Sequence, residues 1–425
     1  MRKKIIVVGP ALSQTGYGEQ CRFALKALMS YDDVFDIYLK AVPWGNSSWI
    51  PFKSPERKWI DSLIVKTATY VQNNGQFDVS FQVTIPNEWE KIAPINIGYT
   101  AGIETTLVTP EWIQKSKIVD KIITISEHSK HVFLNTAWEG VNENTNERVL
   151  LKCETPIDVV HYPVRNYDPQ EINIELDYDF NFLAMAQWGP RKNLENTIKW
   201  WVEEFKDEEV GLIVKTNLIK TSAIDRYFTQ QRISALLENY KDAKCKVYLI
   251  HGNMSQEELT SLFRHPKVKC MVSLTHGEGF GLPLFEAAYN GLPIIAPDWS
   301  GHKDFLYAPK KVTKKGKTTS KVRSHFAKVA YDIKKIQKQV VWKGVLHEDS
   351  CWCYPTKESY STRLRDVYTD YNRFKNLSKS LKRYIITNFT QEKKYKEMAD
   401  SVKEVCGFVS DDEIDSLFES VVQGK

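Results

Sequence analysis

Short apolar runs alternate with amphipathic stretches along the first 165 residues. The first run, residues 4–9, ends in glycine and leads into a loop that contains Gly16 and Gly18. The stretch after this loop, EQCRFALKALMSY, has one apolar stripe at helical spacing. Five further apolar runs follow: FDIYLKAV, FDVSFQVT, INIGYT, KIITIS and DVVHYPV. Short buried strands that alternate with helices are typical of a parallel sheet, so the pattern predicts a doubly wound α/β domain over residues 1–165.

The same alternation begins again after a polar stretch at 165–178, which has the composition of a linker. Five more apolar runs follow it: FNFLAMAQ, VGLIVKT, KVYLI, VKCMVSL and LPIIAP. We therefore predict a second Rossmann-like domain over 178–385, with helices over 386–425 that pack back towards the first domain. At about 150 residues per domain, a chain of 425 residues accommodates both. Two such domains would face each other across a cleft, with ligands at the carboxyl ends of the strands.

The composition predicts a folded chain and indicates the compartment in which it works. The hydrophobic fraction of 42% and the charged fraction of 26% are ordinary for a folded globular chain. Seven cysteines at scattered positions favour reduced thiols over a disulfide framework. The N-terminal apolar run breaks at Gly9-Pro10, which is too early for a signal peptide, and no run approaches the roughly 20 residues of a membrane span. We expect a cytoplasmic protein.

The most informative stretch is a glycine-rich loop, residues 275–281, between a buried strand and a helix that should begin near Pro283. Glycines let the backbone approach a ligand closely, and the free amides at a helix start suit an anionic diphosphate. Glu278 and Glu286 flank this helix start. Carboxylates beside a phosphate site are suited to accepting hydrogen bonds from hydroxyls, one on a sugar ring and the other on a ribose.

This stretch resembles retaining glycosyltransferases of family 4. Its E-G-F-G-L-P string and the E-x7-E spacing of Glu278 and Glu286 match the motif of that family. The resemblance implies a GT-B fold and a metal-independent transfer that needs no cofactor beyond a nucleotide sugar, with UDP-glucose as the default donor. It also implies that Glu278 contacts the donor sugar and that Glu286 binds the ribose hydroxyls. The family's phosphate and sugar contacts would fall on Phe280, Gly281, Leu282 and Pro283.

Further donor contacts follow from the same resemblance. Lys192, in the segment AQWGPRKN, matches a lysine that reaches the diphosphate, and Arg191 is the candidate beside it. The sequence departs from the family at Gln187, which stands where many members have an earlier arginine, and a solvated basic pair is the alternative interpretation of Arg191 and Lys192. The remaining candidates are Ile250 for the base, Lys215 at the end of VGLIVKT, and Gly16 and Gly18, which resemble a glycine loop facing the phosphates across the cleft.

Glu104 is the candidate on the acceptor side. Many family members have a histidine near the reacting carbon, but the matching loop here, GYTAGIETT, has none. Glu104 is the nearest ionisable residue and would orient the acceptor or take its proton. A capping or purely structural glutamate is the alternative interpretation.

Basic residues are concentrated between Pro309 and Lys343, in what resembles an inserted loop. A solvated flexible loop and a platform for a polyanionic acceptor both fit this pattern. The candidate platform residues are Lys310, Lys311, Lys314, Lys315 and Lys317. DNA with hydroxymethylated pyrimidines, which some phage-type glycosyltransferases modify, would be one such acceptor, and cell-surface or lipid-linked polysaccharide is another.

Two further alternatives remain open. Asp177-Tyr-Asp179 is formally the D-x-D metal and nucleotide motif of the other large glycosyltransferase fold, although we expect no metal site. A non-catalytic protein that binds a nucleotide sugar would share the fold, and the presence of both Glu278 and Glu286 argues against it.

Overall fold

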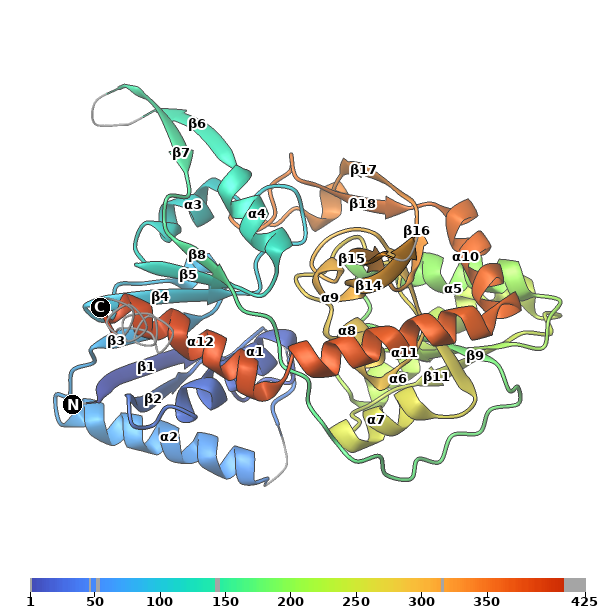
Figure 1. Cartoon of the computed structure of the whole chain (residues 1–425), viewed down its shortest axis with the longest axis horizontal. Helices are drawn as coiled ribbons and strands as arrows, with labels where there is room; N and C mark the ends of the chain where they lie inside the picture. Colours follow the sequence, from blue (N-terminus) through green and yellow to red (C-terminus); the bar gives the residue numbers. More distant parts are fainter. Residues whose placement is uncertain (1, 46, 51–53, 142–145, 315–316, 409–425) are drawn as a thin grey trace.

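The structure is a computed structural model that describes residues 2–45, 47–50, 54–141, 146–314 and 317–408, with only the backbone over 311–319. Two six-stranded parallel sheets lie side by side, each covered by helices (Figure 1). This arrangement confirms the predicted α/β fold class with two doubly wound sheets. None of the helices within the described ranges combines the length and the apolar character that a bilayer crossing requires.

The first sheet has the strand order β2-β1-β3-β4-β5-β8, and all its pairings are parallel. Its strands are β1 (Lys3–Gly9), β2 (Phe35–Ala41), β3 (Val79–Val83), β4 (Ile95–Thr100), β5 (Lys121–Thr124) and β8 (Ile157–Val159). The helices are α1 (Gly16–Met29), α2 (Pro55–Gln72), α3 (Pro110–Ser116) and α4 (Glu127–Asn135). A serine or threonine side chain caps the start of each helix, which fixes where the loops at the strand ends turn. The antiparallel pair β6 (Ala137–Val141) and β7 (Arg148–Lys152) projects from this domain (Figure 1).

The second sheet has the order β11-β10-β9-β12-β13-β16. Its strands are β9 (Asn181–Met185), β10 (Gly211–Lys215), β11 (Lys246–Ile250), β12 (Val268–Val272), β13 (Ile294–Pro297) and β16 (Ala327–Val329). The helices between them are α5 (Leu194–Phe205), α6 (Ala223–Leu236), α7 (Gln256–Arg264), α8 (Leu282–Asn290) and α9 (Lys303–Leu306). The strand order reverses at β9, which lies between β10 and β12. Loops after such a reversal diverge and leave a crevice for a ligand.

The basic stretch predicted as an inserted loop is instead a regular antiparallel hairpin. It consists of β14 (Tyr307–Lys314) and β15 (Lys317–Ser324), paired from Tyr307 opposite Ser324 to Lys314 opposite Lys317. The two strands together contain two valines and three threonines beside six Lys or Arg residues, and β-branched residues favour strands. Lys310, Lys311, Lys314 and Lys317 therefore lie on strands, and Lys315 lies outside the described residues. A second hairpin joins β17 (Tyr331–Lys335) and β18 (Cys351–Pro355).

The chain ends in α10 (Lys357–Thr369), α11 (Tyr371–Asn388) and α12 (Gln391–Val405). Helix α11 packs on α8, and α12 crosses back to pack along α1 of the first domain (Figure 1). Met398 of α12 is fully buried in the same apolar cluster as Phe23 of α1. The last part of the predicted helical region, 409–425, lies outside the described residues.

Removing the Met398 side chain tests the contact between α12 and α1. We expect Met398→Ala to lower the midpoint of thermal unfolding by several degrees, because deleting a fully buried methionine costs transfer free energy and leaves a cavity. Met29→Ala is the matched control, since Met29 is 46% exposed and its loss should leave the midpoint nearly unchanged. Equal midpoints for the two variants, measured by circular dichroism, would contradict the packing of α12 on α1.

Candidate active site

The glycine loop, residues 275–281, connects β12 to α8 and is packed against two other loops by backbone contacts. A Cβ atom on Gly277 would lie 2.4 Å from the carbonyl oxygen of Glu104, and one on Gly279 would lie 2.7 Å from that of Ala101. A Cβ on Gly301 would lie 1.9 Å from the carbonyl oxygen of Gly279. These spaces exclude any side chain. The loop after β4 in the first domain is therefore held directly against the glycine loop of the second.

Helix α8 begins at Leu282, one residue before the predicted Pro283, with Gly281 as the N-cap residue. Gly281 has a φ of 93°, a left-handed conformation that favours glycine, and it offers no side chain to the first-turn amides. Among the described residues, no side chain caps this helix. The amides of Leu282 and Leu284 therefore have no side-chain cap among the described residues, and a helix start of this kind can hold an anion.

The four predicted catalytic residues come together beside this helix start. Lys192 Nζ donates to both carboxylate oxygens of Glu278, at 2.6 and 2.7 Å. Arg191 lies 3.3 Å from the same carboxylate and 3.2 Å from Glu104 Oε1. The cations come from the short helix η2 (Pro190–Lys192) after β9, and Glu104 comes from the loop after β4. Two cations and two carboxylates from both domains thus form one balanced cluster.

Burial and charge act in opposite directions on this cluster. Burial alone favours the neutral form of Glu278, but the charges of Lys192 and Arg191 outweigh it and lower the pKa of Glu278 to about 2, from an ordinary 4.5. Burial and the neighbouring Arg191 lower the pKa of Lys192. Glu278 therefore stays ionised throughout the physiological range, and its charge holds Lys192 in place.

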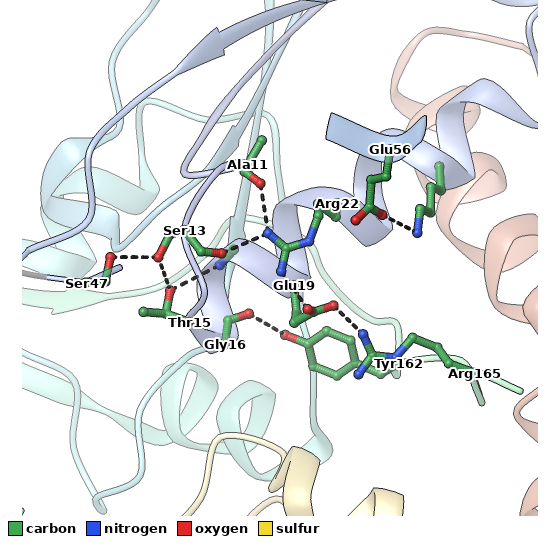
Figure 2. Close-up of polar contacts among 12 residues, drawn as sticks. Ala11, Ser13, Thr15, Gly16, Glu19, Arg22, Ser47, Glu56, Tyr162 and Arg165 are labelled. Atoms are coloured by element: carbon green, nitrogen blue, oxygen red, sulfur yellow. Dashed lines mark hydrogen bonds and ion pairs between the residues drawn. The ribbon is translucent and has the colours of Figure 1, made fainter. Parts of the chain in front are cut away.

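Glu286 belongs to a second ion cluster, centred on Arg165. The Arg165 guanidinium donates to Glu286 Oε1 and to Glu19 Oε2, both at 2.5 Å. Figure 2 shows the Glu19 side, where Arg22 also donates to Glu19, at 2.6 Å. The cluster joins α1 to α8 through the segment that follows β8. Glu278 and Glu286 are therefore held by different cations, and each lies in its own cluster.

The two carboxylates beside Arg165 differ in their ionisation. For Glu19, the charges of Arg165 and Arg22 overcome the opposing effect of burial and lower the pKa to about 2. For Glu286, burial prevails and raises the pKa, although Arg165 acts against it. Arg165 was not among the predicted site residues, because a single arginine in a polar linker gives no signal in the sequence.

The predicted glycines of α1 have different surroundings. A Cβ on Gly18 would lie 1.9 Å from the carbonyl oxygen of Ser13, so Gly18 is required for packing. Gly16 has open space at that position, and Figure 2 shows its carbonyl accepting from the Tyr162 hydroxyl, at 3.4 Å. Tyr17 stands between these two glycines in the sequence, and its hydroxyl accepts a hydrogen bond from the Ala101 amide at 3.2 Å. This residue ties the start of α1 to the loop that contacts Gly279.

Lys215 and Ile250 are neighbours at the carboxyl edge of the second sheet, where they pair across β10 and β11. Lys215 Nζ donates to the carbonyl of Gly252 at 3.0 Å, and burial lowers the pKa of this lysine. The next strand, β9, ends at the same edge and leads to Lys192. Lys215 and Ile250 thus lie at the same end of the sheet as the ion cluster of Lys192 and Glu278.

His128, at the start of α4, was not predicted as a site residue. Its ring makes an edge contact with Trp299 of the second domain at 5.1 Å between centroids, and burial lowers its pKa to about 4. In the described part of the chain, its buried Nε2 has no hydrogen-bond partner. Nothing in the pattern SEHSKH distinguishes this histidine from a surface residue of a helix, because its neighbour Trp299 is remote in sequence.

The D-x-D residues have other partners. Asp177 accepts from the Tyr248 hydroxyl at 2.8 Å and lies 3.1 Å from Lys246 Nζ. The Asp179 side chain is 94% exposed. Over the ranges that the structure describes, no group of three His, Cys, Asp or Glu side chains is arranged to hold a metal ion.

Comparisons with known proteins agree with this architecture. Residues 182–311 match the family model of glycosyl transferases group 1. No curated protein is significantly similar to the chain in sequence. Solved structures with the same fold include sucrose-phosphate synthase from Thermosynechococcus elongatus, with a TM-score of 0.59 and 11% identity over 96% of this chain and 100% of that one.

Two further structures share the fold. A glycosyltransferase from Rickettsia africae has a TM-score of 0.58 and 11% identity, over 95% of this chain and 99% of that one. The E. coli trehalose-phosphate synthase bound with UDP-2-fluoro glucose has a TM-score of 0.53 and 9% identity, over 96% and 99% of the two chains. Identities this low show the fold alone. Together with the match over 182–311, the GT-B fold supports a glycosyltransferase.

Proposed function

We propose that the protein is a retaining glycosyltransferase that moves a hexose from a nucleotide sugar to an acceptor hydroxyl. The observation that carries the proposal is the ion cluster of Glu278, Lys192 and Arg191 beside the uncapped start of α8. Cations and free amides at one point suit a diphosphate, and an ionised carboxylate beside them suits a sugar hydroxyl. UDP-glucose is the first donor to test, since the E. coli structural neighbour was bound with a UDP-glucose analogue.

Breaking the sugar–phosphate bond builds negative charge on the leaving diphosphate. Lys192, Arg191 and the first-turn amides of α8 would stabilise this charge, and the proposed mechanism invokes no metal ion. The ionised Glu278 would hold Lys192 in position before the donor binds and accept a hydrogen bond from the sugar afterwards. Glu104, paired with Arg191, would orient the acceptor hydroxyl or take its proton.

Glu286 would accept hydrogen bonds from the ribose hydroxyls, and Arg165 would keep the Glu286 carboxylate ionised. Burial favours the protonated form of Glu286, which would offer the ribose one acceptor oxygen fewer. The contact with Arg165 opposes this effect. We therefore assign Arg165 as a positioning residue for the donor.

We propose two candidate acceptors. DNA with hydroxymethylated pyrimidines is one candidate, favoured by the basic β14–β15 hairpin, and cell-surface or lipid-linked polysaccharide is the alternative. The seven free thiols suit a reducing compartment such as the cytoplasm. A non-catalytic nucleotide-sugar-binding protein is the second function class, and it would bind donors without turnover.

Substituting the first cluster tests catalysis. We expect Lys192→Gln and Glu278→Gln each to lower kcat about 10²- to 10³-fold, the usual cost of removing one group that stabilises the developing charge. Lys199→Gln, an exposed lysine on the neighbouring α5, is the control and should keep the wild-type rate.

A thermal-shift series with UDP-, GDP- and ADP-sugars identifies the donor for this assay. UDP release and product mass are then followed with hydroxymethylated DNA and with glycans, and NMR of the product gives its anomeric configuration. Rates within a few-fold of wild type in both variants would remove Lys192 and Glu278 from the mechanism. Donor binding without UDP release in any assay would favour the non-catalytic alternative.

Substituting Arg165 tests the second cluster. Arg165→Met removes the cation that lowers the pKa of Glu286, so this pKa should rise further and the carboxylate should protonate at a higher pH. We expect the donor KM to increase, and to increase more at pH 6 than at pH 8, with a smaller effect on kcat.

Arg365→Met is the matched control, because Arg365 also bridges two carboxylates, those of Glu204 and Glu208, on α5 and the turn after it. This control should change only the midpoint of thermal unfolding. A donor KM for Arg165→Met that is unchanged, or that increases equally at all pH values, would exclude the positioning role.

A further inference from the structure

A groove of about 1060 Å³ lies between the base of the β14–β15 hairpin and α11, and we call it the basic groove. The hairpin contributes Lys310, and His325 follows its second strand. The side chains of α11 that line it include Arg373, Ser380 and Arg383. None of the residues proposed above for donor binding or catalysis lines the groove.

Positive charge is concentrated around the basic groove. β14 and β15 each contain three Lys or Arg residues, α11 contains five, and none of the three elements contains Asp or Glu. Among the described residues, no carboxylate pairs with Lys310, Lys321 or Arg383. Arg373 lies 3.1 Å from Asp370, but both side chains are more than half exposed, so this pair is weak and exchanges readily with solvent. The groove therefore carries positive charge that the described protein leaves mostly unneutralised.

The hairpin holds this charge at a cost in stability. Lys310 lies directly opposite Lys321 across the two strands, and both are exposed. Directly opposed residues of antiparallel strands share a face, where like charges destabilise the pairing. Arg323, two residues after Lys321, adds a third cation to that face. An anion between these side chains would relieve the repulsion.

Helix α11 presents a polar stripe to the groove. Its lining residues recur every three or four positions: Arg373, Asn376, Leu377, Ser380, Arg383, Tyr384, Thr387 and Asn388. This stripe extends about 20 Å along the helix and combines cations with hydroxyl and amide donors. The other face of α11 is apolar and packs on α8, where Ser378 Oγ donates to the carbonyl of Gly291 at 2.9 Å. The groove thus lies on the outer side of α11, away from α8.

We propose that the basic groove binds the phosphodiester backbone of a nucleic acid. Arginines, lysines and short polar donors along a concave path are the contacts that such backbones receive in proteins. A bilayer would require a flat or protruding face with large apolar side chains, whereas this surface is hollowed and most of its lining residues are charged or carry hydroxyl or amide groups. The inference deepens the acceptor part of the proposed function, which gives DNA as one candidate, because it assigns a nucleic-acid surface outside the residues proposed for donor binding and holds whichever sugar is transferred.

Fluorescence anisotropy of the full chain with labelled single- and double-stranded oligonucleotides of about 20 nucleotides tests the proposal. We expect binding that weakens about 20- to 40-fold between about 50 and 200 mM KCl, as for roughly three phosphate contacts. The variant Lys310→Ser/Arg373→Ser/Arg383→Ser should weaken binding at low salt by more than about tenfold and flatten the salt dependence by about 0.7 to 0.9 units of log–log slope per cation.

The control variant Lys58→Ser/Lys152→Ser/Lys206→Ser removes three exposed lysines elsewhere and the same net charge. It should bind oligonucleotides like the wild type. The proposal is overturned by equal losses in the two variants, by absence of binding at low salt, or by groove-dependent binding to phosphatidylserine vesicles in place of oligonucleotides. A thermal shift with UDP-sugars on the same variants separates these outcomes from failure of the donor site.

Discussion

The candidate site depends on close contacts between loop backbones, which leave no room for a side chain at Gly277, Gly279 or Gly301. Each position leaves a Cβ less than 3 Å from a carbonyl oxygen, so three loops meet at distances that only glycine permits. Ser300 completes the arrangement with a φ of 69°, and its hydroxyl accepts from the Glu278 amide at 2.8 Å. The contact brings the loop after β4 close enough for Glu104 to reach Arg191. The glycines are therefore needed for the meeting of the two domains as well as for access to a ligand.

The number of cations around each carboxylate explains why the two glutamates of the E-x7-E motif differ. Glu278 pairs with Lys192 and also with Arg191, which it shares with Glu104. These two cations lower the pKa of Glu278 to about 2 in spite of burial. Glu286 shares the single guanidinium of Arg165 with Glu19, and its pKa is raised. Loss of Arg165 would therefore raise the pKa of Glu286 further, whereas Glu278 would keep one cation if the other were lost.

Local patterns were enough to predict the elements that carry the site. The apolar runs correspond to all six strands of the first sheet and to β9–β13 of the second, whereas β16 was not predicted, and the glycine loop before Pro283 leads into α8. The hairpin was not predicted, because its lysines suggested a solvated loop, although its valines and threonines favour strands. Contacts between residues that are distant in the sequence could not be predicted from local patterns. Arg165 and Glu286 are 121 positions apart, and the ring contact of His128 with Trp299 depends on how the domains meet.

The two chain crossings between the domains lie against each other, next to the Arg165 cluster. The first crossing follows β8 and the second follows α11, and the amide of Val164 donates to the carbonyl of Phe389 at 2.7 Å. The Phe389 ring also lies 5.5 Å from that of Phe285 in α8. Both crossings therefore meet beside Arg165, one residue after Val164, and the Arg165 guanidinium bonds to Glu19 of α1 and to Glu286 of α8.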